Sequence, residues 1–132
     1  MNVGEAAERS GLPVKTVRYY ANIGLVEPLG RSQAGYRIYG DEEVSKLIFI
    51  RRARSFDFSV RECRELLDLY GDKSRSSKDV KRIALKRLSE IDEKLTELQK
   101  LRDELARVAN ECHGDNRPDC PILDSFSGQV QV

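Results

Sequence analysis

Long apolar runs are missing from this chain of 132 residues. No stretch approaches the roughly 18 consecutive apolar residues that a membrane-spanning helix needs, so we expect no membrane partner. The first residues, Met-Asn-Val-Gly-Glu, also lack the positive charge followed by an apolar run that is typical of a signal peptide. The sequence therefore predicts a cytoplasmic protein in a reducing compartment.

Cysteine and histidine are scarce, with three cysteines and one histidine in the chain. In a reducing compartment, cysteines bind metals or sense redox state more often than they form structural disulfides. An iron–sulfur cluster within one chain needs about four cysteines and is excluded. The absence of a C-x-x-C motif argues against a thioredoxin-like redox enzyme.

Glycine and proline are absent from residues 78–111. Apolar residues recur there every three or four positions, which predicts a helix with one narrow apolar stripe. The stripe consists of Ala84, Leu88, Ile91, Leu95, Leu98, Leu101, Leu105 and Val108. Such a rod is about 50 Å long, so we expect it to pair with a second copy; the alternative is a surface helix packed on its own domain. The uneven spacing around Leu98 leaves parallel and antiparallel pairing open.

Acidic residues are nearly absent between Arg9 and Gly40, where a single acid accompanies five basic residues. Asn2 and Glu5 are typical of a capping box that begins a short helix. Gly11 permits a tight turn, and a second helix is predicted from Val14 to about Asn22. This is a helix-turn-helix arrangement, whose second helix presents polar side chains to the major groove of DNA. Those side chains are Lys15, Thr16, Arg18, Tyr19 and Tyr20.

A short alternating strand, residues 36–39, follows a set of turn residues and predicts a small hairpin, or wing. Arg31 and Arg37 are expected to neutralise DNA phosphates. Tyr36 and Tyr39 are expected to donate hydrogen bonds to the phosphates or to pack beneath them. The alternative is that the tyrosines only cover the core of the head.

Two further helices complete the predicted head. Asp41 is expected to cap the third, which continues to about Phe56 and carries a basic end that includes Arg54, another predicted DNA contact. Ser59 and Glu62 predict a capping box for a fourth helix that ends near residue 70. Cys63 lies on the apolar stripe of that helix and is interpreted as a small buried hydrophobe.

Cys112 and Cys120 bracket a loop rich in turn-forming residues, so their sulfurs can converge. Pro121 is expected to open a last helix, residues 122–127, that gives the loop apolar cover. Two thiolates under such cover favour a soft metal ion. Zinc prefers four ligands and mercury can use three, whereas two thiolates satisfy the linear coordination of Cu(I), Ag(I) or Au(I).

The head resembles that of the MerR family of transcription regulators. The resemblance rests on Gly11-Leu12, Val17-Arg18-Tyr19-Tyr20, Gly24-Leu25-Val26 and Arg31…Gly35-Tyr36-Arg37-Ile38-Tyr39, and it continues through the rod. Pro13 departs from the Ser or Thr that caps this helix in many members. The resemblance implies a homodimer with an antiparallel coiled coil, each head contacting one half of a dyad-symmetric promoter.

Within the family, the chain is similar to the copper-efflux regulators. Ser77 stands where mercury and zinc sensors supply a cysteine from the partner subunit, and the resemblance places Ser77 beside the metal loop. We expect one Cu(I), Ag(I) or Au(I) per subunit as effector, with the helix dipole and Lys81 offsetting the charge of the site. The resemblance further implies that RNA polymerase is activated through distortion of an overlong promoter spacer.

The predicted chain is thus mainly α-helical and is not an enzyme. Residues 1–70 form a winged helix-turn-helix DNA-binding domain, 71–77 a linker, 78–111 a dimerisation helix, and 112–132 the metal-binding loop with a C-terminal helix and tail. Two alternatives stay open. One is a thiol-based, redox-sensing transcription regulator. The other is a cytosolic copper buffer or chaperone, which leaves the basic second helix and the wing unexplained.

Overall fold

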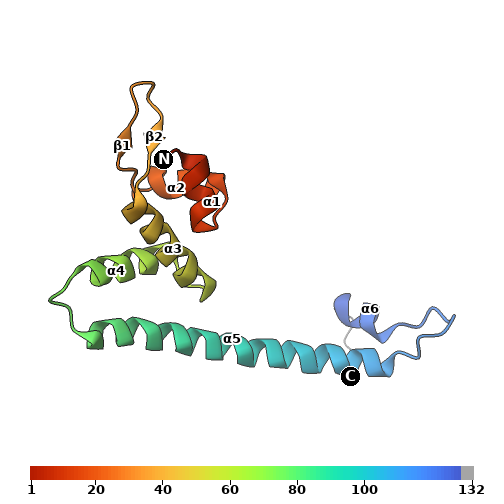
Figure 1. The fold of residues 1–132 in the computed structure, drawn as a ribbon. Coiled ribbons are helices and arrows are strands. Elements are labelled where there is room, and N and C mark those ends of the chain that lie inside the picture. Colours follow the sequence, from red (N-terminus) through yellow and green to blue (C-terminus); the bar gives the residue numbers. More distant parts are fainter. Residues whose placement is uncertain (129–132) are drawn as a thin grey trace. The chain divides into compact units, whose positions relative to one another are not determined.

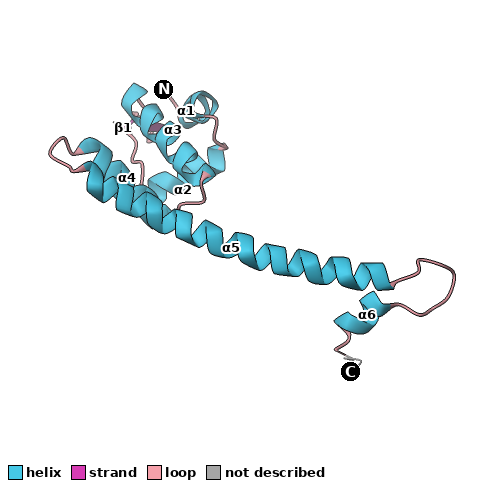
Figure 2. Ribbon diagram, turned by 90° about the horizontal axis from the view of Figure 1, so that it is seen from below, coloured by secondary structure: helices cyan, strands magenta, loops and turns pink. Residues whose placement is uncertain are grey.

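The computed structural model describes residues 1–128, and the chain is mainly helical, as predicted (Figures 1 and 2). The helices are α1 (Val3–Ser10), α2 (Val14–Asn22), α3 (Asp41–Ser55), α4 (Val60–Gly71), α5 (Ser77–Glu111) and α6 (Pro121–Phe126). A two-stranded sheet consists of β1 (Gly30–Arg31) and β2 (Arg37–Ile38). The chain divides into two compact units, Met1–Ile83 and Ala84–Val132. No helix of the described part is long and apolar enough to cross a membrane.

Helices α1 and α2 form the predicted helix-turn-helix pair. The side chain of Asn2 accepts a hydrogen bond from the Glu5 amide at 2.9 Å and so caps α1. A Schellman motif ends α2, in which Leu25 N–H donates to the Tyr20 carbonyl at 2.9 Å and Gly24 N–H donates to that of Ala21 at 3.1 Å. Gly24 has φ +71°, a left-handed conformation that favours glycine.

The wing is shorter than the predicted strand at residues 36–39. Its antiparallel ladder pairs Gly30 with Ile38 and Arg31 with Arg37. Tyr39 leaves the ladder and pairs with the start of the chain instead. Its amide donates to the Met1 carbonyl at 2.7 Å, and the Met1 amine donates to the Tyr39 carbonyl at 2.6 Å. This second pairing draws Tyr39 into the head.

The starts of α3 and α4 differ in their capping. Asp41 does not cap α3, contrary to the prediction, because Gly40 occupies the N-cap and Asp41 is the first helical residue. There it pairs with Arg9 at 3.2 Å and adds negative charge to the positive end of the helix dipole. The capping box of α4 is confirmed: Ser59 Oγ accepts from the Glu62 amide at 3.1 Å, and Glu62 Oε1 accepts from the Ser59 amide at 2.9 Å.

One apolar core holds the first unit together. Helix α1 packs on both α2 and α3, and α4 packs on α3. The buried side chains are Ala6, Ala7, Val17, Tyr20, Leu25, Val26, Tyr39, Val44, Leu47, Ile50 and Cys63. Cys63 has no exposed surface, which confirms its interpretation as a buried hydrophobe. The core thus fixes α2 and the base of the wing on one scaffold.

Helix α5 is an unbroken helix of 35 residues that starts in the first unit and continues into the second. Five leucines of its stripe remain between 51% and 66% exposed, namely Leu88, Leu95, Leu98, Leu101 and Leu105. Val108, near its end, is only 3% exposed. In both views the chain after α5 turns back, so that α6 lies beside the last turns of α5 (Figures 1 and 2). Most of the stripe therefore has no cover within the described chain.

Candidate nucleic-acid interface and thiol loop

The outer face of α2 carries most of the predicted groove-reading side chains. Lys15 and Arg18 are exposed, Tyr19 is 51% exposed, and Thr16 is half-buried. Val17, between them in sequence, is fully buried. This division follows from helical geometry, since residues three to four positions apart share a face. The exposed face has the polar and basic character of a recognition helix.

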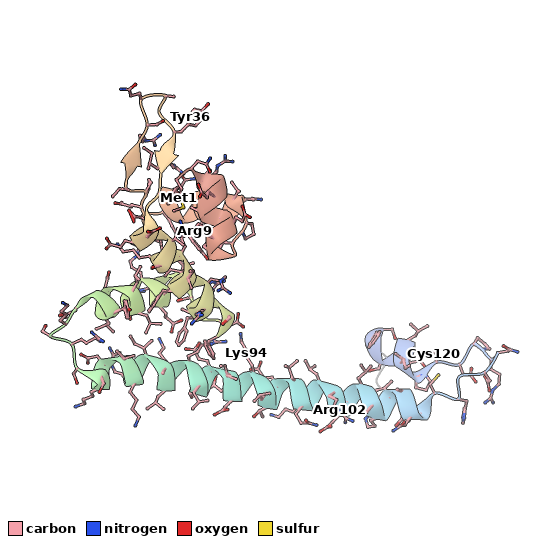
Figure 3. The ribbon with its side chains drawn as sticks, in the orientation of Figure 1. Met1, Arg9, Tyr36, Lys94, Arg102 and Cys120 are labelled. Carbon is pink, nitrogen blue, oxygen red and sulfur yellow. The ribbon has the colours of Figure 1, made fainter. Side chains whose placement is uncertain are left out.

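A groove, which we call the wing groove, lies between the start of α1, the end of α2 and the wing. It is lined by Met1, Asn2, Val3, Arg18, Asn22, Arg31, Ser32, Gly35, Tyr36, Arg37 and Ile38. Arg31 Nη1 donates to the Gly35 carbonyl at 2.9 Å, which closes the wing loop. Tyr36 lies near the tip of the wing and is 74% exposed (Figure 3). Three arginines and no acid line this groove, so its charge suits phosphate.

Arg37 links the wing to the end of α2. Its guanidinium donates to Asn22 Oδ1 at 2.6 Å and to the Arg18 carbonyl at 3.4 Å. Two of its nitrogens are therefore directed at protein acceptors. In this arrangement Arg37 holds the wing beside the recognition helix, in addition to contributing charge to the wing groove.

Tyr20 and Tyr39 are core residues: for Tyr20 this differs from the predicted DNA contact, and for Tyr39 it matches the alternative of covering the core of the head. Tyr20 is 5% exposed because it shares the inner face of α2 with Val17, three positions earlier. Tyr39 is 1% exposed, and its hydroxyl has no hydrogen-bond partner in the described structure. Burial raises the pKa of both hydroxyls, although nearby arginines oppose the shift. Neither side chain is available to DNA in this conformation.

Two arginines from other helices contact the region around α2. Arg54, at the basic end of α3, hydrogen-bonds to the Phe58 carbonyl and to Tyr20, and its side chain stays exposed. Arg64, on α4, donates to the carbonyls of Ile23 and Gly24 at 2.9 and 3.0 Å. Sequence reasoning missed Arg64, since no local pattern signals a contact across 40 residues of chain.

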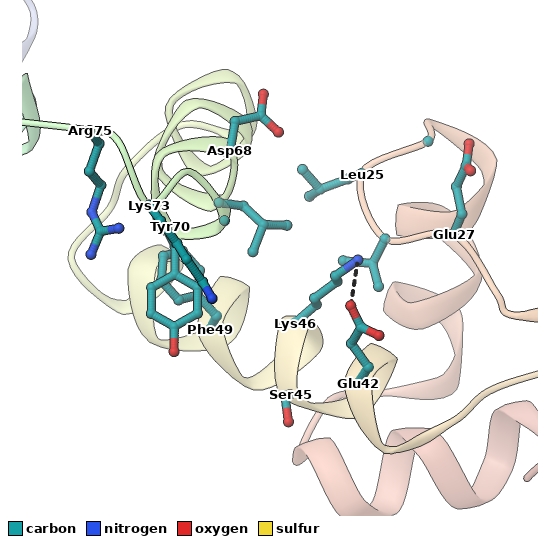
Figure 4. A pocket seen from close by; sticks show the side chains of 14 residues that line it. Leu25, Glu27, Glu42, Ser45, Lys46, Phe49, Asp68, Tyr70, Lys73 and Arg75 are labelled. Carbon is teal, nitrogen blue, oxygen red and sulfur yellow. Dashed lines mark ion pairs between the residues drawn. The ribbon is translucent and has the colours of Figure 1, made fainter.

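A hollow separates part of α4 from the turn after α2 (Figure 4). On one side it is bordered by Leu25 and Glu27, and on the other by Asp68 and Tyr70. A Glu42–Lys46 ion pair at 3.8 Å lies on its wall. The end of α2 is thus incompletely packed against the second half of α4.

The thiol loop, residues 112–120, belongs to the second unit. Cys112 and Cys120 are both free thiols and half-buried, and Cys120 directly precedes α6 (Figure 3). Asp115 is engaged by Arg117, whose amide and Nε donate to its carboxylate at 2.9 and 2.8 Å. His113 is exposed.

The donor set of this loop fits a soft monovalent ion. Within residues 1–128, no three His, Cys, Asp or Glu side chains gather into a possible metal site. The two thiols are soft ligands, and two such ligands complete the linear coordination of a d¹⁰ monovalent cation. Ser77 and Lys81, predicted to lie near the metal of a partner subunit, are exposed in the first turns of α5.

Two family models match the chain. The model described as "MerR HTH family regulatory protein" matches residues 1–69, and the model "MerR, DNA binding" matches residues 44–108. Together they extend from the first helix almost to the end of α5.

Curated relatives match over nearly the whole chain. The HTH-type transcriptional regulator HmrR of Rhizobium leguminosarum bv. viciae is 55% identical and covers 96% of this chain and 98% of its own length. "Heavy metal-dependent transcription regulator 2" of Rhizobium meliloti is 47% identical, over 100% of this chain and 90% of its own. The HTH-type transcriptional regulator CueR of Salmonella typhi is 42% identical, over 97% and 93%.

Among solved structures, the transcription regulator PbrR691 of Ralstonia metallidurans, crystallised with Lead(II), has a TM-score of 0.81 at 30% identity. It covers 96% of this chain and 98% of its own. A regulator from Bacillus cereus reaches a TM-score of 0.79 at 17% identity, which supports the fold alone.

Proposed function

Because the chain belongs to the MerR family of helix-turn-helix transcription regulators, which are DNA-binding proteins and not enzymes, we propose that it activates copper-resistance or efflux genes in response to Cu(I). The observation that carries the proposal is the pair of free, half-buried thiols that bracket one loop. A relative named as a heavy metal-dependent transcription regulator supports a metal ion as effector.

The proposed DNA interface combines the recognition helix with the wing. Lys15, Thr16, Arg18 and Tyr19 reach the major groove from the exposed face of α2. Arg31 and Tyr36 contact phosphates from the wing, and Arg54 contacts them from the end of α3. The wing groove, with its three arginines, then follows the DNA backbone.

The protein acts as a homodimer joined by the exposed leucine stripe of α5. Charge favours the antiparallel orientation that the stripe alone left open. Residues 77–89 carry five basic residues and one acidic residue, whereas residues 90–111 carry seven acidic and four basic residues. Antiparallel pairing places the basic half of one helix beside the acidic half of the other, and parallel pairing places like charges together.

Antiparallel pairing also brings the start of the partner's α5 to the thiol loop. A monovalent ion bound by two thiolates leaves one net negative charge. Ser77 would close the site through its backbone, and Lys81 with the positive end of the helix dipole would offset the charge. A bound Cu(I), Ag(I) or Au(I) would supply two linear metal–sulfur bonds that hold Cys112 and Cys120 together.

The response follows from a change in the position of the loop and α6. With Cys112 and Cys120 drawn together, α6 packs differently against the dimer and the two heads move. The bound promoter spacer is then bent and untwisted, so that RNA polymerase engages both promoter elements. Metal can drive this only to the extent that it binds the two conformations with different affinity. The regulator acts in the cytoplasm, where promoter DNA and the polymerase are found.

The test is Cu(I) titration of the dimer under anaerobic reducing conditions against a competing chelator, with X-ray absorption at the copper edge. We expect one ion per subunit with two sulfur neighbours in linear geometry. Weak Cu(I) binding combined with disulfide formation under mild oxidant would instead identify a redox-sensing regulator, the second candidate that two free thiols in one loop allow. Tight Cu(I) binding without promoter binding would identify a copper buffer or chaperone.

The first prediction concerns the two thiols. Cys112→Ser or Cys120→Ser should abolish Cu(I)-dependent transcription, because one thiolate cannot complete linear coordination. Promoter affinity should stay within about two-fold, since the heads are unchanged. Gel-shift titration and in vitro transcription measure the two quantities. Cys63→Ala is the matched control and should still respond to Cu(I); normal induction in either serine variant would rule out the two-thiolate site.

A further inference from the structure

Arg64, in the first half of α4, forms two hydrogen bonds with the segment that ends the recognition helix α2. Its Nη2 donates to the Ile23 carbonyl at 2.9 Å, and its Nη1 donates to the Gly24 carbonyl at 3.0 Å. A planar guanidinium that binds two acceptors restricts their orientation as well as their distance. Arg64 therefore fixes one end of α2 relative to α4.

The acceptors of Arg64 lie in a defined part of the backbone. Ile23 and Gly24 form the C-terminal cap of α2, where the Schellman motif holds the chain and Gly24 adopts its left-handed conformation. Carbonyls at a helix C-terminus carry partial negative charge, which favours a cationic donor. A displacement of the guanidinium would consequently shift the whole C-terminal turn of α2.

Apart from Arg64, α4 meets α2 in the shared core, where Cys63 of α4 and Tyr20 of α2 are both buried. Helix α4 packs on α3, and α2 packs on α1. Of the α4 residues, Cys63 alone among those described is fully buried in the shared core. Leu67 is partly buried against this core, and beyond it Asp68 faces Leu25 and Glu27 across the open hollow (Figure 4). Beside this incompletely packed region, the two hydrogen bonds of Arg64 join α4 directly to the C-terminal end of α2.

Helix α4 is also the element through which the rest of the chain reaches the head. It continues through residues 72–76 into α5, which leads to the thiol loop. Resting on the proposed function, we propose that Arg64 is the positioning residue that couples α4 to the recognition helix. A displacement that begins at the thiol loop enters the head through α4, and Arg64 transmits it to the C-terminal end of α2.

Coupling and simple folding make different predictions. Arg64→Met removes both hydrogen bonds but keeps an apolar stem on an exposed position. If Arg64 couples the helices, promoter affinity should change by less than about two-fold, while the Cu(I)-dependent induction ratio should fall about five-fold or more, a typical size for an allosteric coupling. A purely structural role would lower promoter affinity and leave the induction ratio of the bound dimer unchanged.

The experiment uses the full-length dimer and a promoter fragment recovered from genomic DNA by the wild-type protein. For wild type, Arg64→Met and Arg64→Lys we would measure promoter affinity, Cu(I) binding and run-off transcription with and without Cu(I). Arg61→Met, an equal change one turn earlier on the exposed part of α4, is the matched control. Amide hydrogen exchange of residues 20–26, in the metal-free dimer, gives a readout independent of metal.

We expect Arg61→Met to behave as wild type and both Arg64 variants to lose induction, because lysine keeps the charge without the planar fork. Wild-type induction in either Arg64 variant would overturn the coupling. A wild-type protein that does not respond to Cu(I) would overturn the proposed function instead. In that case amide hydrogen exchange alone tests the contact between α4 and α2. Faster exchange of residues 20–26 in Arg64→Met than in Arg61→Met supports the contact, and equal exchange refutes it.

Discussion

Asn22 illustrates how a side chain could support the proposed DNA binding by positioning a neighbour, here Arg37. Asn22 carries no charge, yet it accepts a 2.6 Å hydrogen bond that directs Arg37 along the wing groove. Loss of this acceptor should loosen the wing while leaving the number of phosphate contacts unchanged. Position and charge can therefore be separated by experiment.

We predict that Asn22→Ala weakens promoter binding about three- to ten-fold at every salt concentration, with little change in the slope of log K against log salt. Arg18→Ala should reduce that slope by about one, because it removes a cation that displaces counterions. Fluorescence anisotropy over a range of salt concentrations measures both. Asn110→Ala, the same change near the end of α5, is the control. A reduced slope in Asn22→Ala would contradict the positioning role.

Cys63 differs from the two loop cysteines in its environment. Burial raises the pKa of its thiol, with Glu62 adding to the shift and Arg54 opposing it. We predict that iodoacetamide at pH 8 modifies Cys112 and Cys120 in the native protein but modifies Cys63 only after denaturation, as peptide mass spectrometry can measure. Rapid native alkylation of Cys63 would contradict its burial.

The same raised pKa has a consequence for stability. The unfolded thiol ionises near its ordinary value of 9.0, before the folded one does. The free energy of unfolding should therefore fall as the pH rises above that value, and it should fall less steeply in Cys63→Ala. Tyr20 and Tyr39, whose pKa values are also raised, add to the decline in both proteins.

At the scale of single elements, helix starts were the most accurately predicted features. The capping box of α4 is a local pattern, since Ser59 and Glu62 contact each other within one turn. We predict that Ser59→Ala lowers the free energy of unfolding by about 1 kcal/mol. Urea denaturation at fixed protein concentration measures this free energy. Ser45→Ala, at an exposed position of α3, is the control. Equal midpoints for the two variants would show that the box contributes nothing.

Features set by distant parts of the chain were predicted less well. Capping residues, glycine and proline positions and the apolar period of the rod predicted the helices to within one or two residues, because all of these signals are local. Asp41 was predicted to cap α3, whereas Gly40 occupies the N-cap and Asp41 is the first helical residue. For Tyr39 the sequence left two alternatives open, DNA contact and core cover, because its backbone partner Met1 is 38 residues away. The Arg64 contact has no sequence signal for the same reason.

The candidate site divides in the same way. The exposed face of α2 was predictable from spacing and residue type alone, and the same local reasoning selects the two loop cysteines as the proposed metal ligands. The inward orientation of Tyr20 follows from its sharing a helix face with Val17. Residue type alone does not predict this orientation, because tyrosine is common both in cores and on surfaces. The engagement of Asp115 by Arg117, which leaves the thiols as the soft donors of the loop, required the folded loop.

At the scale of the whole molecule, the charge division along α5 makes the orientation of the proposed dimer testable. We would attach spin labels at Lys94, near the middle of the helix, or at Lys78, near its start, in a background without Cys112 and Cys120. Antiparallel pairing should give a short label-to-label distance at position 94 and one of about 50 Å at position 78. Parallel pairing gives short distances at both positions, as double electron–electron resonance would reveal.

The unbroken 35-residue course of α5 also constrains how the gene can change. Inserting or deleting one residue within the helix would rotate everything after that point by about 100° about the helix axis. The leucines beyond the insertion would then point away from their neighbours in the stripe, and the thiol loop would leave the helix on a different side. A seven-residue insertion would nearly restore the stripe. Length variation should therefore be tolerated in residues 72–76 and avoided in α5, or occur there in steps of whole heptads.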